Sequence, residues 1–192
     1  LKVGRLNVSR DRVYPSILIV VKRAIGLGIL AISVSLVVWL PFYFRFGSIL
    51  GWGLDFKSGM MTIWKNYDGP NYLIIAKTFY DKRLIGTQFS NPLGLDYYPA
   101  HLPLFPVVIS LFGIFLSGPR AMLLTSLLGT GLMFSVFYLY LKNLGVKQSG
   151  WISIVLLWLP ARFLAVRSVG SPESWFMLFI LGSLWAFRTG WP

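Results

Sequence analysis

The stretch AIGLGILAISVSLVVWLPFYF, residues 24–44, contains no charged residue over about 21 positions. A helix of this length crosses the hydrocarbon core of a bilayer, which is about 30 Å thick. Trp39, Phe42 and Tyr43 stand near its end, and aromatic side chains of this kind favour the boundary between lipid and water. We therefore predict that residues 24–44 form the first transmembrane helix.

The composition of the whole chain also favours a membrane protein. Of the 192 residues, 56% are hydrophobic and 12% are charged, whereas a soluble domain has about 45–50% apolar and about 25% charged residues. Three further apolar runs cover residues 121–141, 151–166 and 173–187. We predict an all-α, polytopic membrane protein with about four spanning helices, a large outer loop over residues 45–120, and no cleavable signal peptide.

The charge of the chain is strongly positive. Eighteen Lys and Arg residues against six Asp and Glu residues give a net charge of +12. In a soluble protein this excess would suggest a nucleic-acid partner. Here the basic residues flank apolar runs, as they do in cytoplasmic loops of membrane proteins. We therefore expect membrane lipid and no nucleic acid as a partner, and we place the basic residues 1–23 in the cytoplasm.

The length of the run at residues 102–116 decides the topology. Its 15 residues would form about 22 Å of helix, too short to span comfortably, so we expect it to dip into the outer leaflet. Lys142 and Lys147 then fall inside, as positive residues should. If residues 102–116 crossed fully, both lysines would fall outside and Glu173 would fall in the cytoplasm. The dipping arrangement gathers the following residues outside: Asp68, Arg120, Arg162, Arg167 and Glu173.

Asp68 is the acid that the sequence singles out, within YDGPNY at residues 67–72. Pro70 suits the first turn of a new helix, which would place Asp68 beside unpaired backbone N–H groups. Asp is also a preferred helix cap, and capping alone would explain it. Glu173 has the same alternative, because Ser171-Pro172-Glu173 is a typical helix start.

Three motifs resemble those of a known family, in the same order. YDGPNYLIIA at residues 67–76 is similar to the W-D-G-x-x-Y-x-x-I-A element of the GPI mannosyltransferase II family and its prokaryotic relatives. YPAHLPLFP at residues 98–106 resembles their F-x-P-L-Y-P element. Leu159-Pro160 followed by SPESWF at residues 171–176 resembles their P-S … Y-T-E-S-L-F element. Tyr67 replaces the family's Trp, and Ser171-Pro172 replaces its Tyr-Thr.

The resemblance implies a GT-C type glycosyltransferase. Such enzymes have many transmembrane helices, carry their catalytic acid in the first outer loop, and take a sugar from a polyprenyl-phosphate donor. The chain would be an N-terminal part, since it begins at Leu1 and ends after an apolar run. The implied location is multi-pass, in the plasma membrane of a prokaryote or the endoplasmic reticulum of a eukaryote. Mannose is suggested by the family alone; another hexose or a pentose stays open.

The chemistry of such a transfer assigns roles to particular residues. An acceptor hydroxyl is a weak nucleophile, so a carboxylate must take its proton, and we assign that base to Asp68. The leaving phosphate requires positive charge, for which Arg120, Arg162 and Arg167 are candidates. Glu173 would position the acceptor or orient an arginine, unless it only starts a helix.

The remaining candidates each have a structural alternative. Tyr72, Tyr97 and Tyr98 would stack on sugar rings, although an aromatic belt at the interface explains them equally well. His101 would bind a phosphate or a divalent metal, or would serve the interface. With one His, no Cys and six scattered acids, we expect no all-protein metal site, and a metal cofactor stays open.

Two other classes remain open from the sequence. A transporter or flippase would need ionisable residues inside its spans, where they mark substrate pathways. The apolar runs have almost none, and the acids concentrate in the predicted outer loop instead. A non-catalytic membrane subunit is the other alternative.

Overall fold

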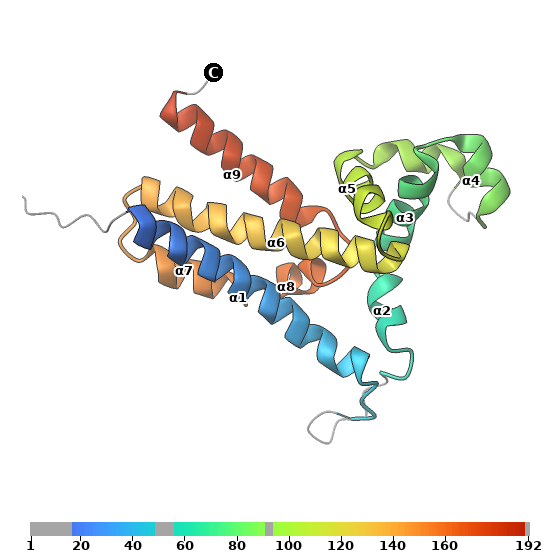
Figure 1. The fold of residues 1–192 in the computed structure, drawn as a ribbon, viewed down its shortest axis with the longest axis horizontal. Coiled ribbons are helices and arrows are strands. Elements are labelled where there is room, and N and C mark those ends of the chain that lie inside the picture. The colour runs from blue at the N-terminus through green and yellow to red at the C-terminus, as the bar shows by residue number, and fades with distance from the viewer. Residues whose placement is uncertain (1–16, 49–55, 91–93, 191–192) are drawn as a thin grey trace, which may run out of the picture.

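The computed structural model describes residues 17–48, 56–90 and 94–190, and all regular elements in these ranges are helical (Figure 1). The elements are α1 (Ile17–Tyr43), α2 (Met60–Trp64), α3 (Gly69–Thr78), α4 (Lys82–Gln88), the 3₁₀ helix η1 (Leu95–Ala100), α5 (Leu104–Gly113), α6 (Gly118–Asn143), α7 (Ser149–Leu156), α8 (Ala161–Arg167) and α9 (Glu173–Thr189). The predicted all-α class is confirmed for these residues.

The long helices form a bundle, and the short helices α2 to α5 gather at one end of it (Figure 1). Helices α1, α6 and α9 extend away from the region occupied by α2 to α5, as Figure 1 shows. Helix α6 is central, because it packs against α1, α9, α5 and α7. The short helices α2 to α5 correspond to the segment predicted as the large outer loop.

The prediction of four spanning helices is too high. By length and composition, α1 and α6 can cross a membrane, and α7 and α8 add a third span only if they are taken as one helix bent by 71°. Helix α9 has 17 residues and does not join these candidates within the described ranges. The bend follows from the sequence around Pro160, because proline supplies no backbone N–H to continue the first helix.

Helix α1 begins earlier than predicted. It starts at Ile17 rather than at residue 24, so Lys22 and Arg23 lie within the helix. Long basic side chains can stay in a helix at a membrane boundary, because their stems lie along apolar surface while the charged ends reach water. Of the predicted cytoplasmic tail, residues 1–16 lie outside the described residues.

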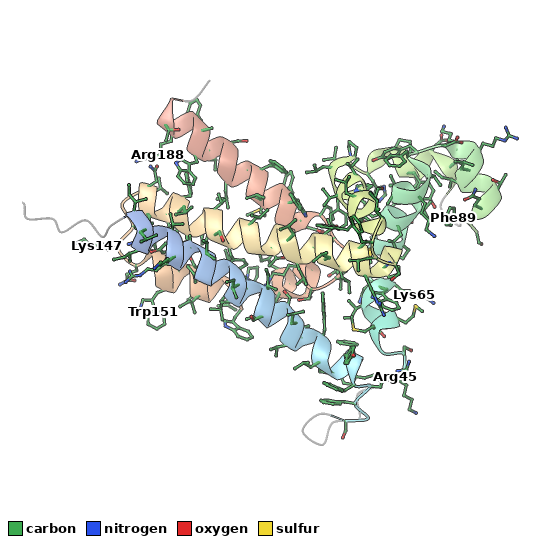
Figure 2. The ribbon with its side chains drawn as sticks, viewed as in Figure 1. Arg45, Lys65, Phe89, Lys147, Trp151 and Arg188 are labelled. Atoms are coloured by element: carbon green, nitrogen blue, oxygen red, sulfur yellow. The ribbon has the colours of Figure 1, made fainter. Side chains whose placement is uncertain are left out.

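Basic residues lie at both ends of the bundle. The start of α1, the end of α6 and the end of α9 lie at the same end of the bundle (Figure 1). Figure 2 places Lys147 and Arg188 at this end, and Arg45 and Lys65 at the other. Helix α5 is a short apolar helix of 10 residues, as a segment dipping into one leaflet requires. The compartment that each end faces stays a prediction.

Glycines bring α1 and α6 into close backbone contact. A Cβ added at Gly28 would lie 2.6 Å from the carbonyl oxygen of Gly131, and one added at Gly131 would lie 2.8 Å from Ile32. Ser135 of α6 donates a hydrogen bond of 3.0 Å to the carbonyl oxygen of Ala24 in α1. Small residues that allow such approach are the usual basis of helix association in membranes.

Replacing Gly28 with Leu should therefore separate α1 from α6. A side chain there meets backbone, which cannot move aside, and overpacking of this kind costs about 1–3 kcal/mol. We expect a lower midpoint of thermal unfolding in detergent. Gly26→Ala is the matched control on the same helix, because a Cβ at Gly26 meets nothing within 4 Å. An equal decrease of the unfolding midpoint in both variants would contradict the close contact between α1 and α6.

A buried arginine ties the bent helix pair to α1. Arg167 at the end of α8 is 1% exposed. Its guanidinium donates to the carbonyl oxygens of Ala31 (3.0 Å) and Leu157 (2.8 Å) and to the hydroxyl of Ser35 (3.2 Å). It also lies 5.3 Å from the ring centroid of Phe134. The carbonyl of Leu157 belongs to the break after α7, so Arg167 satisfies an acceptor that the bend leaves without a helical partner.

Arg167→Lys should destabilise the bundle although the charge remains. An ammonium group cannot donate through a planar fork to acceptors on two helices at once. Leaving a buried carbonyl without a donor costs about 1–3 kcal/mol. Thermal unfolding in detergent measures this, with Arg162→Lys on the exposed side of α8 as control. If the two variants have the same midpoint of thermal unfolding, the proposed role of Arg167 inside the bundle is wrong.

Candidate functional site

Asp68 stands at the N-cap position of α3, with Pro70 in the first turn as predicted. The residue between them is a glycine in a place with little room for a side chain. A Cβ at Gly69 would lie 3.1 Å from the carbonyl oxygen of Trp64 and 3.2 Å from the sulfur of Met122. The tight packing of Gly69 against α2 and α6 therefore fixes the start of α3, while the Asp68 side chain remains exposed.

The Asp68 carboxylate does not cap its own helix. It makes no side-chain hydrogen bond to a capping N–H, and instead accepts hydrogen bonds from the Asn71 amide at 3.3 Å and the Tyr97 hydroxyl at 3.2 Å. Asp81 behaves differently at the start of α4, where it accepts from the backbone N–H groups of Arg83 and Leu84. Capping therefore explains Asp81 and does not explain Asp68.

Aromatic rings and a histidine lie against this acid. The ring of His101 lies 4.9 Å from the ring centroids of both Tyr72 and Tyr97, edge to face with Tyr72. Tyr80 donates a hydrogen bond of 2.8 Å to the carbonyl oxygen of His101. His101 is 7% exposed, and its Nδ1 has no hydrogen-bond partner among the described residues. A buried polar atom without a partner is costly, so Nδ1 is available to a ligand or a water.

The pKa values of the two tyrosines reflect the acids nearby. Burial raises the pKa of Tyr72 well above its ordinary value, and the charges of Asp68 and Glu173 raise it further. The charge of Asp68 also raises the pKa of Tyr97, with smaller contributions from burial and from their hydrogen bond. Both phenols therefore stay protonated as donors, and Tyr72 lies within the field of both carboxylates.

A cavity of about 450 Å³ opens between α5, η1 and the start of α9, and Tyr72 of α3 forms part of its wall. Its walls are mainly apolar and are formed by Tyr72, Ala100, Leu102, Leu104, Phe105, Pro172, Glu173, Trp175, Phe176 and Phe179. Glu173 is the one acid of this wall, and its Oε2 is buried without a partner among the described residues. Asp68 is not part of the wall.

The predicted helix start at Ser171 takes a different form. Helix α9 begins at Glu173 with Pro172 at the N-cap position and no capping side chain. The Ser171 hydroxyl donates instead to the carbonyl oxygen of Val166 at 2.9 Å. Glu173 does lie in the first turn, as expected. Its unpartnered oxygen in the cavity wall is a feature that the sequence pattern could not indicate.

The three predicted arginines are in different places. Arg120 is exposed in the first turn of α6, and Arg162 is exposed on α8. Arg167 does not reach the site, because its guanidinium is bound inside the bundle. Within the described residues the one salt bridge joins Lys82 and Asp96, so no arginine pairs with Asp68 or Glu173. The part of the chain that the structure describes also contains no group of three or more His, Asp or Glu side chains that could hold a metal ion.

Sequence reasoning did not single out Asn71 or the apolar cavity. Asn71 follows Asp68 by three residues at a helix start, a spacing that places the two side chains on the same face. The cavity joins residues from 72 to 179, so no local pattern could reveal it. No family model, curated protein or solved structure matches this chain.

The contrast between Asp68 and Asp81 predicts a difference in stability. Asp81→Ala removes two hydrogen bonds to the start of α4 and should cost about 1 kcal/mol. Asp68→Ala removes no cap and should stay within about 0.5 kcal/mol of the unchanged protein. Thermal unfolding in detergent compares them. A larger loss for Asp68→Ala than for Asp81→Ala would mean that Asp68 is a structural residue after all.

Proposed function

We propose that this chain carries the catalytic carboxylate of an integral-membrane glycosyltransferase. The enzyme would transfer a sugar from a polyprenyl-phosphate donor to an acceptor hydroxyl. The observation that carries the proposal is the state of Asp68. Its carboxylate is exposed, is held by Tyr97 and Asn71, and caps no helix. The ordered resemblance of three motifs to the GPI mannosyltransferase II family supports the same assignment.

In the proposed reaction Asp68 acts as general base. The acceptor oxygen forms a new bond to the anomeric carbon of the sugar, and its proton passes to the Asp68 carboxylate. The bond from the anomeric carbon to the phosphate oxygen breaks, and polyprenyl phosphate leaves with the electron pair. The hydrogen bonds from Tyr97 and Asn71 both reach Oδ1 of Asp68, so Oδ2 is the oxygen that they leave to the acceptor.

The surrounding groups suit the other parts of such a substrate. An apolar cavity of about 450 Å³ offers a wall for the first units of a prenyl chain. Arg120 is exposed at the first turn of α6, where the unpaired N–H groups of the helix add to its positive charge. We assign the leaving phosphate to this helix end, with Arg162 as a second candidate.

Glu173 and the aromatic residues complete the proposal. The unpartnered oxygen of Glu173 in the cavity wall suits a hydroxyl donor, so we assign it to positioning the acceptor or the sugar. Tyr72 stays protonated and can donate a hydrogen bond while its ring lies against a sugar, and Tyr97 uses its phenolic proton to hold Asp68. The Nδ1 of His101 is a further polar contact.

The alternatives have less support. A transporter would place ionisable groups along a path through the bundle. The one buried cation found among the described residues, Arg167, is bound to backbone carbonyls and lines none of the cavities described. A non-catalytic subunit would leave the Asp68 arrangement and the partnerless Glu173 oxygen without a purpose.

Asp68→Asn in the full-length protein tests the proposal. Loss of the base should lower turnover about 10²- to 10⁴-fold, with little change in the amount of folded protein. The assay supplies polyprenyl-phosphate mannose, glucose or a pentose to membranes that contain the protein, and measures transfer of labelled sugar. Asp96→Asn is the matched control, because Asp96 is an exposed acid paired with Lys82.

The outcomes separate the mechanism from the function. Transfer that survives Asp68→Asn unchanged would remove the proposed base. No transfer by the unchanged protein from any of these donors would count against the glycosyltransferase itself.

A further inference from the structure

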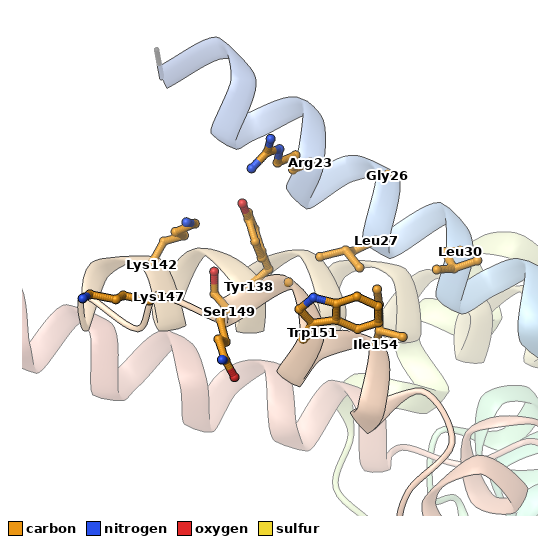
Figure 3. Close-up of a pocket in the computed structure, with 12 residues that line it drawn as sticks. Arg23, Gly26, Leu27, Leu30, Tyr138, Lys142, Lys147, Ser149, Trp151 and Ile154 are labelled. Atoms are coloured by element: carbon orange, nitrogen blue, oxygen red, sulfur yellow. The ribbon is translucent and has the colours of Figure 1, made fainter. Parts of the chain in front are cut away.

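A second pocket lies at the opposite end of the bundle from Asp68, between α1, α6 and α7 (Figure 3). It is open and has a volume of about 460 Å³. The residues that line it are Arg23, Gly26, Leu27, Leu30, Tyr138, Lys142, Lys147, Gln148, Ser149, Gly150, Trp151 and Ile154. The proposed sugar transfer makes no use of any of them.

The charge of this pocket is entirely positive. Arg23 comes from α1, Lys142 from the last turn of α6, and Lys147 from the connection to α7 (Figure 3). No acidic residue lines it. Three like charges around one pocket repel each other, and an anion placed between them would remove that repulsion. Phosphate is the anion that such Arg and Lys groups bind well.

Two buried hydroxyls add donors for the same anion. Tyr138 is 2% exposed and Ser149 is 1% exposed. Both line the pocket, yet Tyr138 Oη and Ser149 Oγ have no hydrogen-bond partner within the described residues. Buried hydroxyls are almost always paired, because leaving them unpaired is costly. An oxygen of a bound phosphate would accept from them.

An apolar wall continues from the charged end. Leu27 and Leu30 lie along α1, and Trp151 and Ile154 lie along α7. Trp151 is 70% exposed, as an indole at the lipid headgroup level is. A Cβ at Gly26 or Gly150 would meet nothing within 4 Å, so these glycines leave the groove open. A free phosphate would use the cations and leave this wall uncovered.

We propose that this pocket binds the phosphate headgroup of an anionic membrane phospholipid, with one acyl chain along the apolar wall. Arg23, Lys142 and Lys147 contact the phosphate, and Tyr138 and Ser149 donate to its oxygens. The bound lipid bridges α1 to the consecutive helices α6 and α7, which are distant from α1 in sequence, so it stabilises the bundle. Basic pockets between membrane helices are suited to this recognition. The proposal does not depend on the glycosyltransferase assignment.

Lipid binding is tested on the purified full-length protein in detergent. We add dioleoyl phosphatidylglycerol, dioleoyl phosphatidylcholine or inorganic phosphate, and measure thermal unfolding and lipid retention by native mass spectrometry. Phosphatidylglycerol should raise the unfolding midpoint by several degrees, and the other two should not. Equal stabilisation by phosphatidylcholine would overturn the anionic headgroup. Equal stabilisation by inorganic phosphate would overturn the lipid.

Variants assign the binding to this pocket. Lys142→Gln with Lys147→Gln should weaken phosphatidylglycerol binding by about tenfold or more. Lys65→Gln with Arg83→Gln is the matched control, since it removes the same charge from exposed positions at the other end. Retained binding in the first variant, or equal loss in both, would overturn the proposal.

Filling the groove gives a test that keeps every charge. Gly26→Leu places a side chain where nothing lies within 4 Å of the Cβ position, so the fold should tolerate it. It should reduce phosphatidylglycerol retention while the unfolding midpoint without lipid stays unchanged. Unreduced retention by this folded variant would show that the lipid lies elsewhere and would overturn the site.

Discussion

The guanidinium of Arg167 holds together the part of the bundle on which the candidate site depends. It binds a carbonyl at the break after α7 and the carbonyl of Ala31 in the middle of α1, 136 residues before Arg167 in the chain. The chain after Arg167 is then fixed by the Trp39 indole, which donates to the carbonyl oxygen of Ser168. Because this segment leads directly into α9, the position of Glu173 follows from these contacts.

Close packing of α6 links this region to Asp68. The side chain of Met122 fills the space beside both Gly69 and Gly170, where an added Cβ would lie 3.2 Å and 2.3 Å from its sulfur. Gly69 is the first residue of the helix that carries Tyr72, and Gly170 precedes Glu173 in the chain. One methionine on α6 therefore packs against both acidic segments, at positions with little room for a side chain larger than glycine.

The two ends of the bundle have opposite chemical character. At one end lie an exposed acid, Asp68, and an apolar cavity whose wall contains aromatic rings and a buried carboxylate oxygen of Glu173. At the other end three cations and two unpartnered hydroxyls line a pocket without an acid. We propose a lipid-linked sugar for the first and an anionic phospholipid for the second. Both ligands combine a polar head with an apolar chain, which suits sites at the two boundaries of a membrane.

The sequence by itself determined the all-helical class, the apolar helices α1 and α6 that are long enough to cross a membrane, the short α5 and the start of α3 at Gly69-Pro70. These features depend on composition, run length and proline position, all of which are local. Pro160 also marks the bend between α7 and α8, but the sequence could not determine which arginine lies inside, since Arg162 and Arg167 look alike until one guanidinium finds acceptors in the bundle. Nor could it show that the Asp81 side chain caps its helix and the Asp68 side chain does not, because both residues precede a helix. Only the tertiary structure brings Tyr97 to Asp68 and Glu173 to the cavity, and therefore only it decides which acids are free for chemistry.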